Sequence, residues 1–176
     1  SEAGDGILDG LAHPNHLRAM EEHRTKIVNL DGPPGWRSPC VSFNAGLEAV
    51  TGDILVLNHS DIVHAPGNLA TVRAHFGEHP NSVLFGMVVE SDPAQLRGAG
   101  NAGPLLMGTG NPRPLTWLMA VPTQALRSIG GWDLEYMKGV CYEDDDLTAR
   151  LWKSGLDFHF NDAFAGVHQT HSRAYF

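Results

Sequence analysis

Apolar positions along the chain alternate between short continuous runs and stripes spaced three or four residues apart. Residues 54–57 are apolar throughout, which is typical of a strand buried on both faces, as in a parallel α/β sheet. Residues 39–50 instead place Phe43, Leu47 and Val50 on one face of a helix. By the same criteria we expect further strands at 26–30, 82–89, 115–121, 156–160 and 163–167, and further helices at 14–24, 66–76 and 123–129. Strands and helices that alternate in this way predict an α/β fold.

Two polar stretches interrupt this pattern and are expected to be loops. Residues 31–36 hold two prolines and two glycines, which break any regular element. Residues 92–113 hold five glycines and little apolar periodicity. A loop of this length in a compact domain is usually either functional or disordered, and the sequence leaves both readings open.

Length and composition are those of one globular domain: 176 residues, 42% hydrophobic and 18% charged. The net charge of −8 argues against a nucleic-acid partner, and a bound diphosphate would need a cation beside it. No apolar run has the length of a transmembrane helix, and no signal segment opens the sequence. Cys40 and Cys141 form no disulfide framework. We therefore expect free thiols and a cytoplasmic location, with or without contact to a membrane surface.

Four consecutive acidic residues, Glu143 to Asp146, precede a helical apolar pattern. Carboxylates are favourable at a helix N-terminus, and Asp146 and Arg150 have the i,i+4 spacing of an ion pair. A capped helix accounts for one or two of these acids but not for four, because adjacent carboxylates repel and raise one another's pKa. A cluster whose members differ in protonation is also a candidate for general-base catalysis, so a structural and a catalytic reading both stay open.

A second polar cluster follows the apolar run 54–57, at the strand end where open α/β sheets place their ligands. The sequence there is Asn-His-Ser-Asp, at residues 58–61. The carboxylate of Asp61 and the imidazole of His59 could together hold a divalent metal. The alternative is an ordinary polar turn after a strand.

Two motifs in the chain resemble those of a known enzyme family. The turn Gly-Gly-Trp-Asp at 130–133, with Glu-Asp-Asp-Asp-Leu-Thr-Ala-Arg-Leu at 143–151, resembles the acceptor-side signature of family 2 glycosyltransferases of the GT-A fold. The acidic run is also similar to that of the β-1,4-galactosyltransferases, which share this fold. Asn44 and Gly46 match the family's lead-in to its metal motif. The resemblance implies a GT-A-like, mixed but mostly parallel sheet flanked by helices.

The resemblance also sets an expectation for domain organisation. It covers most of residues 1–171 but starts about two strands later than a GT-A domain normally does. We therefore expect a single GT-A-like domain over residues 1–176, truncated at its N-terminus. Residues 92–113 correspond to a region that can act as a lid in this family.

In this family an Asp-x-Asp motif holds a divalent metal, manganese or magnesium, and the metal holds the diphosphate of a nucleotide-sugar donor. By resemblance Asp61 is the second aspartate of that motif, and His59 replaces the first as a metal ligand. A histidine near the C-terminus completes the metal site in several related enzymes. His168, directly after an apolar run, fits this role better than His171. Asn44 is expected on the donor side of the site.

The resemblance further implies an inverting transfer of a sugar to a hydroxyl acceptor in a single in-line displacement. Asp144 is then the base that takes the acceptor proton, and Glu143 orients the acceptor or the base. Gly131, Trp132 and Asp133 are expected to bind the acceptor, with the indole face seating the sugar.

Two other functions stay open on the sequence alone. A metal-dependent phosphohydrolase would also use aspartate and histidine around a cation. A non-catalytic domain of the same ancestry, with a decayed site, would account for His59 in place of an aspartate. The donor nucleotide, the acceptor and the oligomeric state are not set by these motifs.

Overall fold

The computed structural model describes residues 18, 21–22, 25–28, 30, 38–91, 105–139 and 142–169. The chain divides into two compact units, Ser1–Asp31 and Gly32–Phe176, which are treated separately below. The single domain expected over residues 1–176 remains a prediction. The loop expected at 31–36, Cys141 and His171 lie outside the described residues.

The described residues of the first unit support one of its two expected elements. Residues 18 and 21–22 are helical, in agreement with a helix at 14–24. Residues 25–28 and 30 are in no strand, so the strand expected at 26–30 is wrong over these described positions. Ile27 and Val28 are about half exposed, 49% and 47%, so neither is in a core that would fix a strand.

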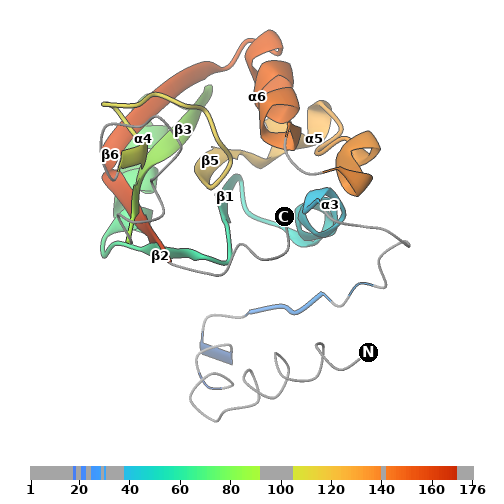
Figure 1. Ribbon diagram of the computed structural model, residues 1–176, viewed down its shortest axis with the longest axis horizontal. Helices are drawn as coiled ribbons and strands as arrows, with labels where there is room; N and C mark the ends of the chain where they lie inside the picture. Colours follow the sequence, from blue (N-terminus) through green and yellow to red (C-terminus); the bar gives the residue numbers. More distant parts are fainter. Residues whose placement is uncertain are drawn as a thin grey trace. The chain divides into compact units, whose positions relative to one another are not determined.

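The second unit contains the elements that carry the candidate site (Figure 1). In chain order they are α3 (Cys40–Ala49), β1 (Ile54–Asn58), β2 (Ile62–His64), α4 (Asn68–Glu78), β3 (Ser82–Glu90), β4 (Leu105–Met107), β5 (Leu118–Pro122), α5 (Thr123–Ser128), the 3-10 helix η2 (Leu134–Lys138), α6 (Glu143–Lys153) and β6 (Asp157–His168). Every helix and strand expected between residues 39 and 129 is present, with bounds shifted by a few residues. The short strands β2 and β4 are additions that the apolar pattern did not predict.

The sheet is mixed rather than mostly parallel, which corrects our expectation. Its strand order is β1-β5-β3-β6-β2, with β4 paired to β3. Only β3 and β6 pair in parallel, and the other pairs among the described strands are antiparallel. The apolar run of β1 suggested a parallel strand, but burial alternates along β1, which lies at the end of the strand order. An apolar run reports burial and not the direction of the neighbouring strand.

The two strands expected at 156–160 and 163–167 are one continuous strand, β6. Its pairing with β3 shifts between Asn161 and Ala165, so the polar residues between them leave the regular ladder. Their polar groups are satisfied locally: Asn161 accepts from the Ala163 amide at 2.9 Å, and Asp162 accepts from the amide and the hydroxyl of Thr109. A polar interruption in sequence is therefore an irregularity within one strand.

Buried apolar residues from strands and helices form one core in this unit, whose largest fully buried side chains are Trp132, Phe85 and Phe164. Figure 1 shows α3, α5 and α6 gathered together, while α4 lies apart from them along β3 and β6. None of the helices in the described part of the chain is both long and apolar enough to cross a bilayer.

Candidate functional site

Strand pairing brings Asp61 and His168 together although 107 residues separate them. Asp61 lies in the turn between β1 and β2, and Ile62, the first residue of β2, pairs with His168, the last residue of β6. The Gln169 amide also donates to the Asp61 carbonyl oxygen at 2.7 Å. The backbone ladder thus fixes the two side chains at one edge of the sheet, as a metal site requires.

Two carboxylates face the ring of His168. Its Nδ1 lies 2.9 Å from Oε2 of Glu90, whose side chain is 1% exposed, and its Nε2 lies 3.2 Å from Oδ2 of Asp61. A carboxylate only accepts hydrogen bonds, so Nδ1–H donates to Glu90. Nε2 can approach Asp61 only with a proton or a cation between them. Metal-binding histidines are oriented in this way by a carboxylate on the second nitrogen.

His59 lies in the same turn as Asp61 and is lodged among aromatic rings. Its amide donates to the Trp117 carbonyl oxygen at 3.1 Å, and its ring centroid is 5.5 Å from that of Phe43. Burial is the main cause that lowers the pKa of His59, and His168 lowers it further, while Asp144 and Asp61 oppose the shift. Its buried Nε2 has no hydrogen-bond partner among the described residues. A ring nitrogen without a hydrogen-bond partner, on a neutral imidazole, has a lone pair that can bind a metal.

The side chains of Asp61, His59 and His168 are of the types that bind divalent cations, and two of them are in contact. One carboxylate, from Asp61, and two imidazoles, from His59 and His168, supply oxygen and nitrogen ligands of the kind that manganese accepts. The structure therefore brings Asp61 and His168 into contact and places His59 near enough for their charges to shift its pKa, but the ligand atoms of the three do not form a close cluster among the described residues. It does not test His171, which is outside the described residues.

The acidic run divides into members with different surroundings. Asp146 forms the expected ion pair with Arg150, at 2.6 Å, and Asp145 is exposed to solvent. Asp144 accepts a hydrogen bond from the Thr116 hydroxyl and is close enough to His59 for its charge to raise the pKa of that ring. The structural reading is correct for Asp146, which forms the ion pair with Arg150. The catalytic reading stays a prediction, and Asp144 is the member of the run whose charge acts on His59.

Glu143 begins α6 and is half-buried. Burial is the main cause that raises the pKa of its carboxyl group, and the negative charges of Asp144 and Asp145 raise it further, against a lowering by a backbone hydrogen bond. Its Oε2 is buried without a hydrogen-bond partner among the described residues. This carboxyl group can hold a proton or pair with a polar group that enters the site.

The Gly130-Gly131 turn is held by Asn44. The side-chain amide of Asn44 donates to the Trp132 carbonyl oxygen at 2.7 Å, and its Oδ1 accepts from the Trp132 amide at 2.8 Å. Gly131 has φ +67°, and a Cβ on it would lie 2.5 Å from that Oδ1. Asn44 was expected on the donor side, but its amide is engaged with the turn instead. It ties α3 to the signature segment.

Trp132 does not present the ring face that we expected to seat an acceptor. The residue is 2% exposed, and its ring packs at a centroid distance of 4.9 Å from Phe43. Asp133 is exposed and caps η2 by accepting from the Glu135 amide at 2.9 Å. Trp132 is therefore core in this structure, because its large apolar ring gains more from burial than from solvent.

Sequence reasoning missed Glu90, Thr116 and Trp117. Glu90 is buried at the end of β3 and pairs with His168 in the parallel ladder. Trp117 stacks on His168 with ring centroids 6.0 Å apart and also neighbours His59. Glu90 carried a signal in the sequence, because a charged residue at the end of an apolar run often lies at a site, but the strand order was needed to interpret it. Thr116 and Trp117, which come immediately before β5, carried no comparable signal.

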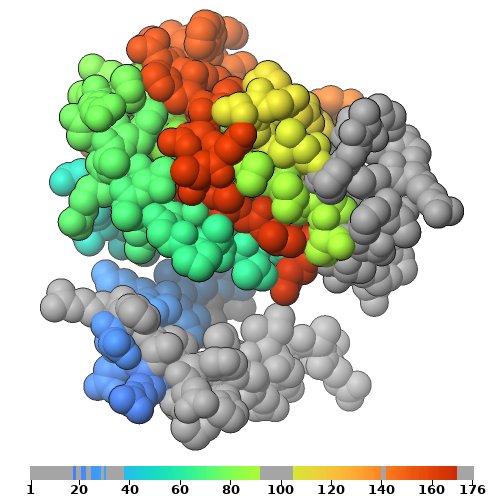
Figure 2. Space-filling view, turned by 90° about the vertical axis from the view of Figure 1, so that its left-hand side faces the viewer, coloured from blue at the N-terminus to red at the C-terminus, as the bar shows by residue number. Residues whose placement is uncertain are grey.

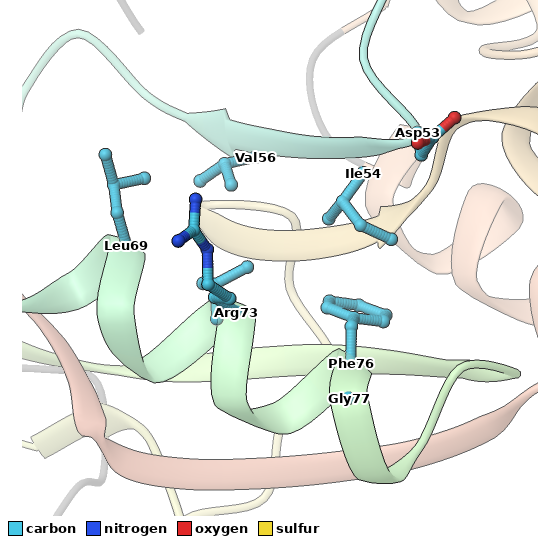
Figure 3. A pocket seen from close by; sticks show the side chains of 8 residues that line it. Asp53, Ile54, Val56, Leu69, Arg73, Phe76 and Gly77 are labelled. Carbon is cyan, nitrogen blue, oxygen red and sulfur yellow. The ribbon is translucent and has the colours of Figure 1, made fainter.

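A separate hollow of about 520 Å³ lies between α4 and β1 (Figure 3). Leu69, Arg73 and Phe76 of α4 face Ile54 and Val56 of β1 across it. None of the residues nominated from the sequence as site residues lines it. Its walls are mainly apolar, so it is not the metal site described above.

Comparisons with known proteins support the fold. No family model matches the sequence, and no curated protein matches it. Among solved structures, the mannosyltransferase PcManGT from Pyrobaculum calidifontis, in complex with GDP-Man and Mn2+, matches with a TM-score of 0.54 and 18% sequence identity. The match covers 92% of this chain and 45% of that chain, so this chain spans less than half the length of that protein. The chain thus shares the fold of the matched part of that mannosyltransferase structure, with a mixed sheet flanked by helices.

Proposed function

We propose that the chain is a GT-A-like domain of a metal-dependent, inverting glycosyltransferase related to family 2. It would transfer a sugar from a nucleotide-diphosphate sugar to a hydroxyl acceptor. The single observation that carries this proposal is the contact between Asp61 and His168, with His59 near enough for the charges of Asp61, His168 and Asp144 to act on its ring. The fold that the chain shares with the similar mannosyltransferase supports it, and the structure of that protein is a complex with GDP-Man and Mn2+.

In this proposal Asp61, His59 and His168 hold manganese or magnesium. When bound, the metal would neutralise the diphosphate as negative charge develops on the leaving group. Glu90 fixes the ring of His168 by accepting from Nδ1–H, which leaves Nε2 as the ligand atom. The diphosphate of the donor would bind at this edge of the sheet. The chain has a net charge of −8, so a bound cation would be the main source of attraction for a negatively charged diphosphate.

Asp144 would remove the proton from the acceptor hydroxyl as that oxygen attacks the anomeric carbon of the donor. The new carbon–oxygen bond forms while the bond to the diphosphate oxygen breaks, and the electron pair leaves with the diphosphate. The Thr116 hydroxyl, bonded to one oxygen of Asp144, orients the carboxylate and leaves its other oxygen for the proton. Glu143 would orient the acceptor through its unpartnered Oε2.

The acceptor surface differs from the one that the signature implied. Trp132 is buried, so we assign the aromatic wall of the site to Trp117, which is part-exposed and stacks on His168. Tyr142, immediately before α6, is 70% exposed and has the left-handed backbone conformation with φ 73°. A strained, exposed aromatic residue beside the proposed base is a second candidate for contact with an acceptor sugar.

Calorimetry with uridine and guanosine diphosphates, with and without manganese, tests the proposed metal site. We expect binding of one of them to require the metal, and Asp61→Asn to abolish this requirement together with tight binding. Asp53→Asn is a matched control, because Asp53 is exposed just before β1 and lies outside the proposed site. Equal diphosphate affinity in excess chelator would overturn the metal-dependent proposal.

Sugar transfer to a panel of glycoside acceptors tests the proposed base. Asp144→Asn should reduce turnover by roughly 10²–10⁴-fold, as is usual when a positioned base is lost. Asp145→Asn, in the same helical turn but exposed, should remain near wild type. An equal effect at both positions would refute the role of Asp144, and hydrolysis of the donor at a rate independent of any acceptor would favour a phosphohydrolase.

A further inference from the structure

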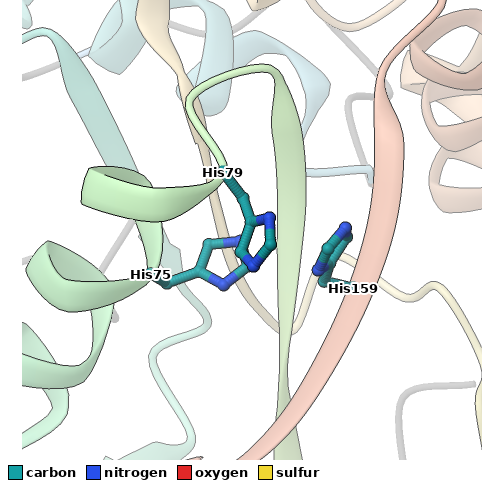
Figure 4. A group of neighbouring side chains, drawn as sticks. All are labelled: His75, His79 and His159. Carbon is teal, nitrogen blue, oxygen red and sulfur yellow. The ribbon is translucent and has the colours of Figure 1, made fainter.

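Three histidines gather at the opposite end of β6 from His168. His75 and His79 come from the last turn of α4 and the residue that follows it, and His159 comes from β6. One ring nitrogen from each lies within 4.8 Å of the other two. Figure 4 shows the three rings turned toward one another, and Figure 2 shows β6, in red, at the surface beside the green segment that contains α4.

We propose that His75, His79 and His159 form a second metal site, for a transition metal of the zinc class. Three imidazoles with one open position are a common zinc arrangement, and zinc–nitrogen bonds of about 2.0–2.1 Å require nitrogens roughly 3.3 Å apart. From a separation of 4.8 Å each nitrogen would have to move by less than about 1 Å. Rotation of the side chains supplies this movement without a change in the backbone.

The local sequence supports this site independently. His75-Phe76-Gly77-Glu78-His79 places two histidines four residues apart, on one face of a helix end, in the order His-x-x-Glu-His. That spacing is used by zinc sites on helices. The His79 amide donates to the His75 carbonyl oxygen at 2.8 Å, so the last hydrogen bond of the helix holds His79, the residue after its end, one turn beyond His75. Glu78 lies beside the cluster, with its carboxylate 4.0 Å from Nε2 of His79.

The ring of His75 is held in the form that a ligand needs. Its Nε2 lies 2.8 Å from the Ser82 hydroxyl, which itself donates to the His79 carbonyl oxygen at 2.8 Å. A hydroxyl has one proton to donate, so it accepts from Nε2–H of His75, and Nδ1 keeps its lone pair. Burial is the main cause that lowers the pKa of His75, and His159 and His79 lower it further, while Glu78 raises it.

The site opens onto a hollow of about 440 Å³, which is lined by the cluster together with Thr71, Glu78 and Asn161. The fourth position of the metal would therefore hold water, or an oxygen from a small ligand in this hollow. The cluster is distinct from the proposed donor site. His159 pairs with Leu84 and His168 with Glu90, and six residues of β3 correspond to about 20 Å.

Competition between the full chain and a chromophoric chelator for zinc chloride tests the proposal. The parent is Asp61→Asn, which removes the anionic ligand of the proposed donor site. We expect the Asp61→Asn protein to bind one zinc per chain. Adding His79→Ala should weaken zinc binding by at least roughly 10–100-fold, because losses of this size follow even when only a residue that orients a metal ligand is changed. The side chain of His79 is 46% exposed, so this replacement should leave the fold intact.

His64→Ala is the matched control, because His64 is an exposed histidine of β2 outside the cluster. X-ray absorption at the zinc edge should show about three imidazole nitrogens near 2.0 Å in the parent and about two in His159→Ala. Zinc affinity that is the same with and without His79, or a shell of oxygen atoms only, would overturn the assignment. An equal loss in His64→Ala would also overturn it.

Discussion

Replacement of Gly131 by alanine tests how the signature turn is built. Gly131 has φ +67°, where a residue with a Cβ costs about 1–2 kcal/mol. The new Cβ would also lie 2.5 Å from Oδ1 of Asn44 and displace it. The two hydrogen bonds between Asn44 and Trp132 would then be lost, at about 1 kcal/mol each. We expect Gly131→Ala to lower the free energy of unfolding by about 3–4 kcal/mol.

Gly130→Ala is the matched control for this change. Gly130 also has a positive φ, +84°, but nothing lies within 4 Å of a Cβ built on it. It should lose only the backbone term, about 1–2 kcal/mol. The two variants therefore share the conformational cost and differ by about 2 kcal/mol from the contact with Asn44.

Urea unfolding followed by circular dichroism measures both variants, with slopes compared to confirm that the unfolded states are similar. Asn44→Ala should lose about 2 kcal/mol in wild type and close to nothing further when added to Gly131→Ala, because the same bonds are already broken. Equal destabilisation by Gly130→Ala and Gly131→Ala would refute the reasoning. Additive losses in the double variant would show that Asn44 acts elsewhere.

Two further predictions concern the charged groups of the site. Glu90→Gln should weaken manganese binding by roughly 10-fold or more, since the amide orients His168 less well and lacks the charge that makes its ring a stronger ligand. Calorimetry against Glu48→Gln, an exposed control on α3, checks this, and unchanged affinity would contradict it. Glu143→Gln should stabilise the fold above about pH 5 and have little effect near pH 4. Folding raises the pKa of Glu143 above its ordinary 4.5, so ionisation of this group destabilises the folded state as the pH rises. Unfolding of both proteins, followed from pH 4 to 8, measures the difference in their free energies of unfolding. A difference that grows toward low pH would contradict this prediction.

The local elements could be predicted from the sequence because they depend on short-range patterns. The helix stripe through Phe43 and Leu47 became α3, and the apolar run 82–89 became β3. The acidic run marked the start of α6, where carboxylates meet free backbone amides. The ion pair of Asp146 followed from its spacing alone. Each of these features is set within a few residues of its neighbours.

Strand direction and order could not be predicted in the same way. A strand buried within a sheet has the same apolar composition whether its neighbour is parallel or antiparallel, so the run that became β1 suggested the wrong pairing. The burial of Trp132 also depends on residues that are distant in the sequence. A tryptophan after a glycine turn can lie in a site or in the core, and packing against Phe43 placed it in the core.

The candidate site also contains some features that the sequence predicts and others that only the tertiary structure sets. The chemistry of Asp61, His59 and Asp144 could be recognised in the sequence, because acids and imidazoles after an apolar run or at a helix start are unusual enough to mark. The resemblance suggested His168 as a partner of Asp61, but their contact, and the position of Glu90 behind His168, follow from the order β3-β6-β2. The histidine cluster likewise needs β6 to bring His159 beside α4. The residue types alone determine which atoms can bind a metal, whereas the distances between those atoms come from backbone ladders that join residues far apart in the chain.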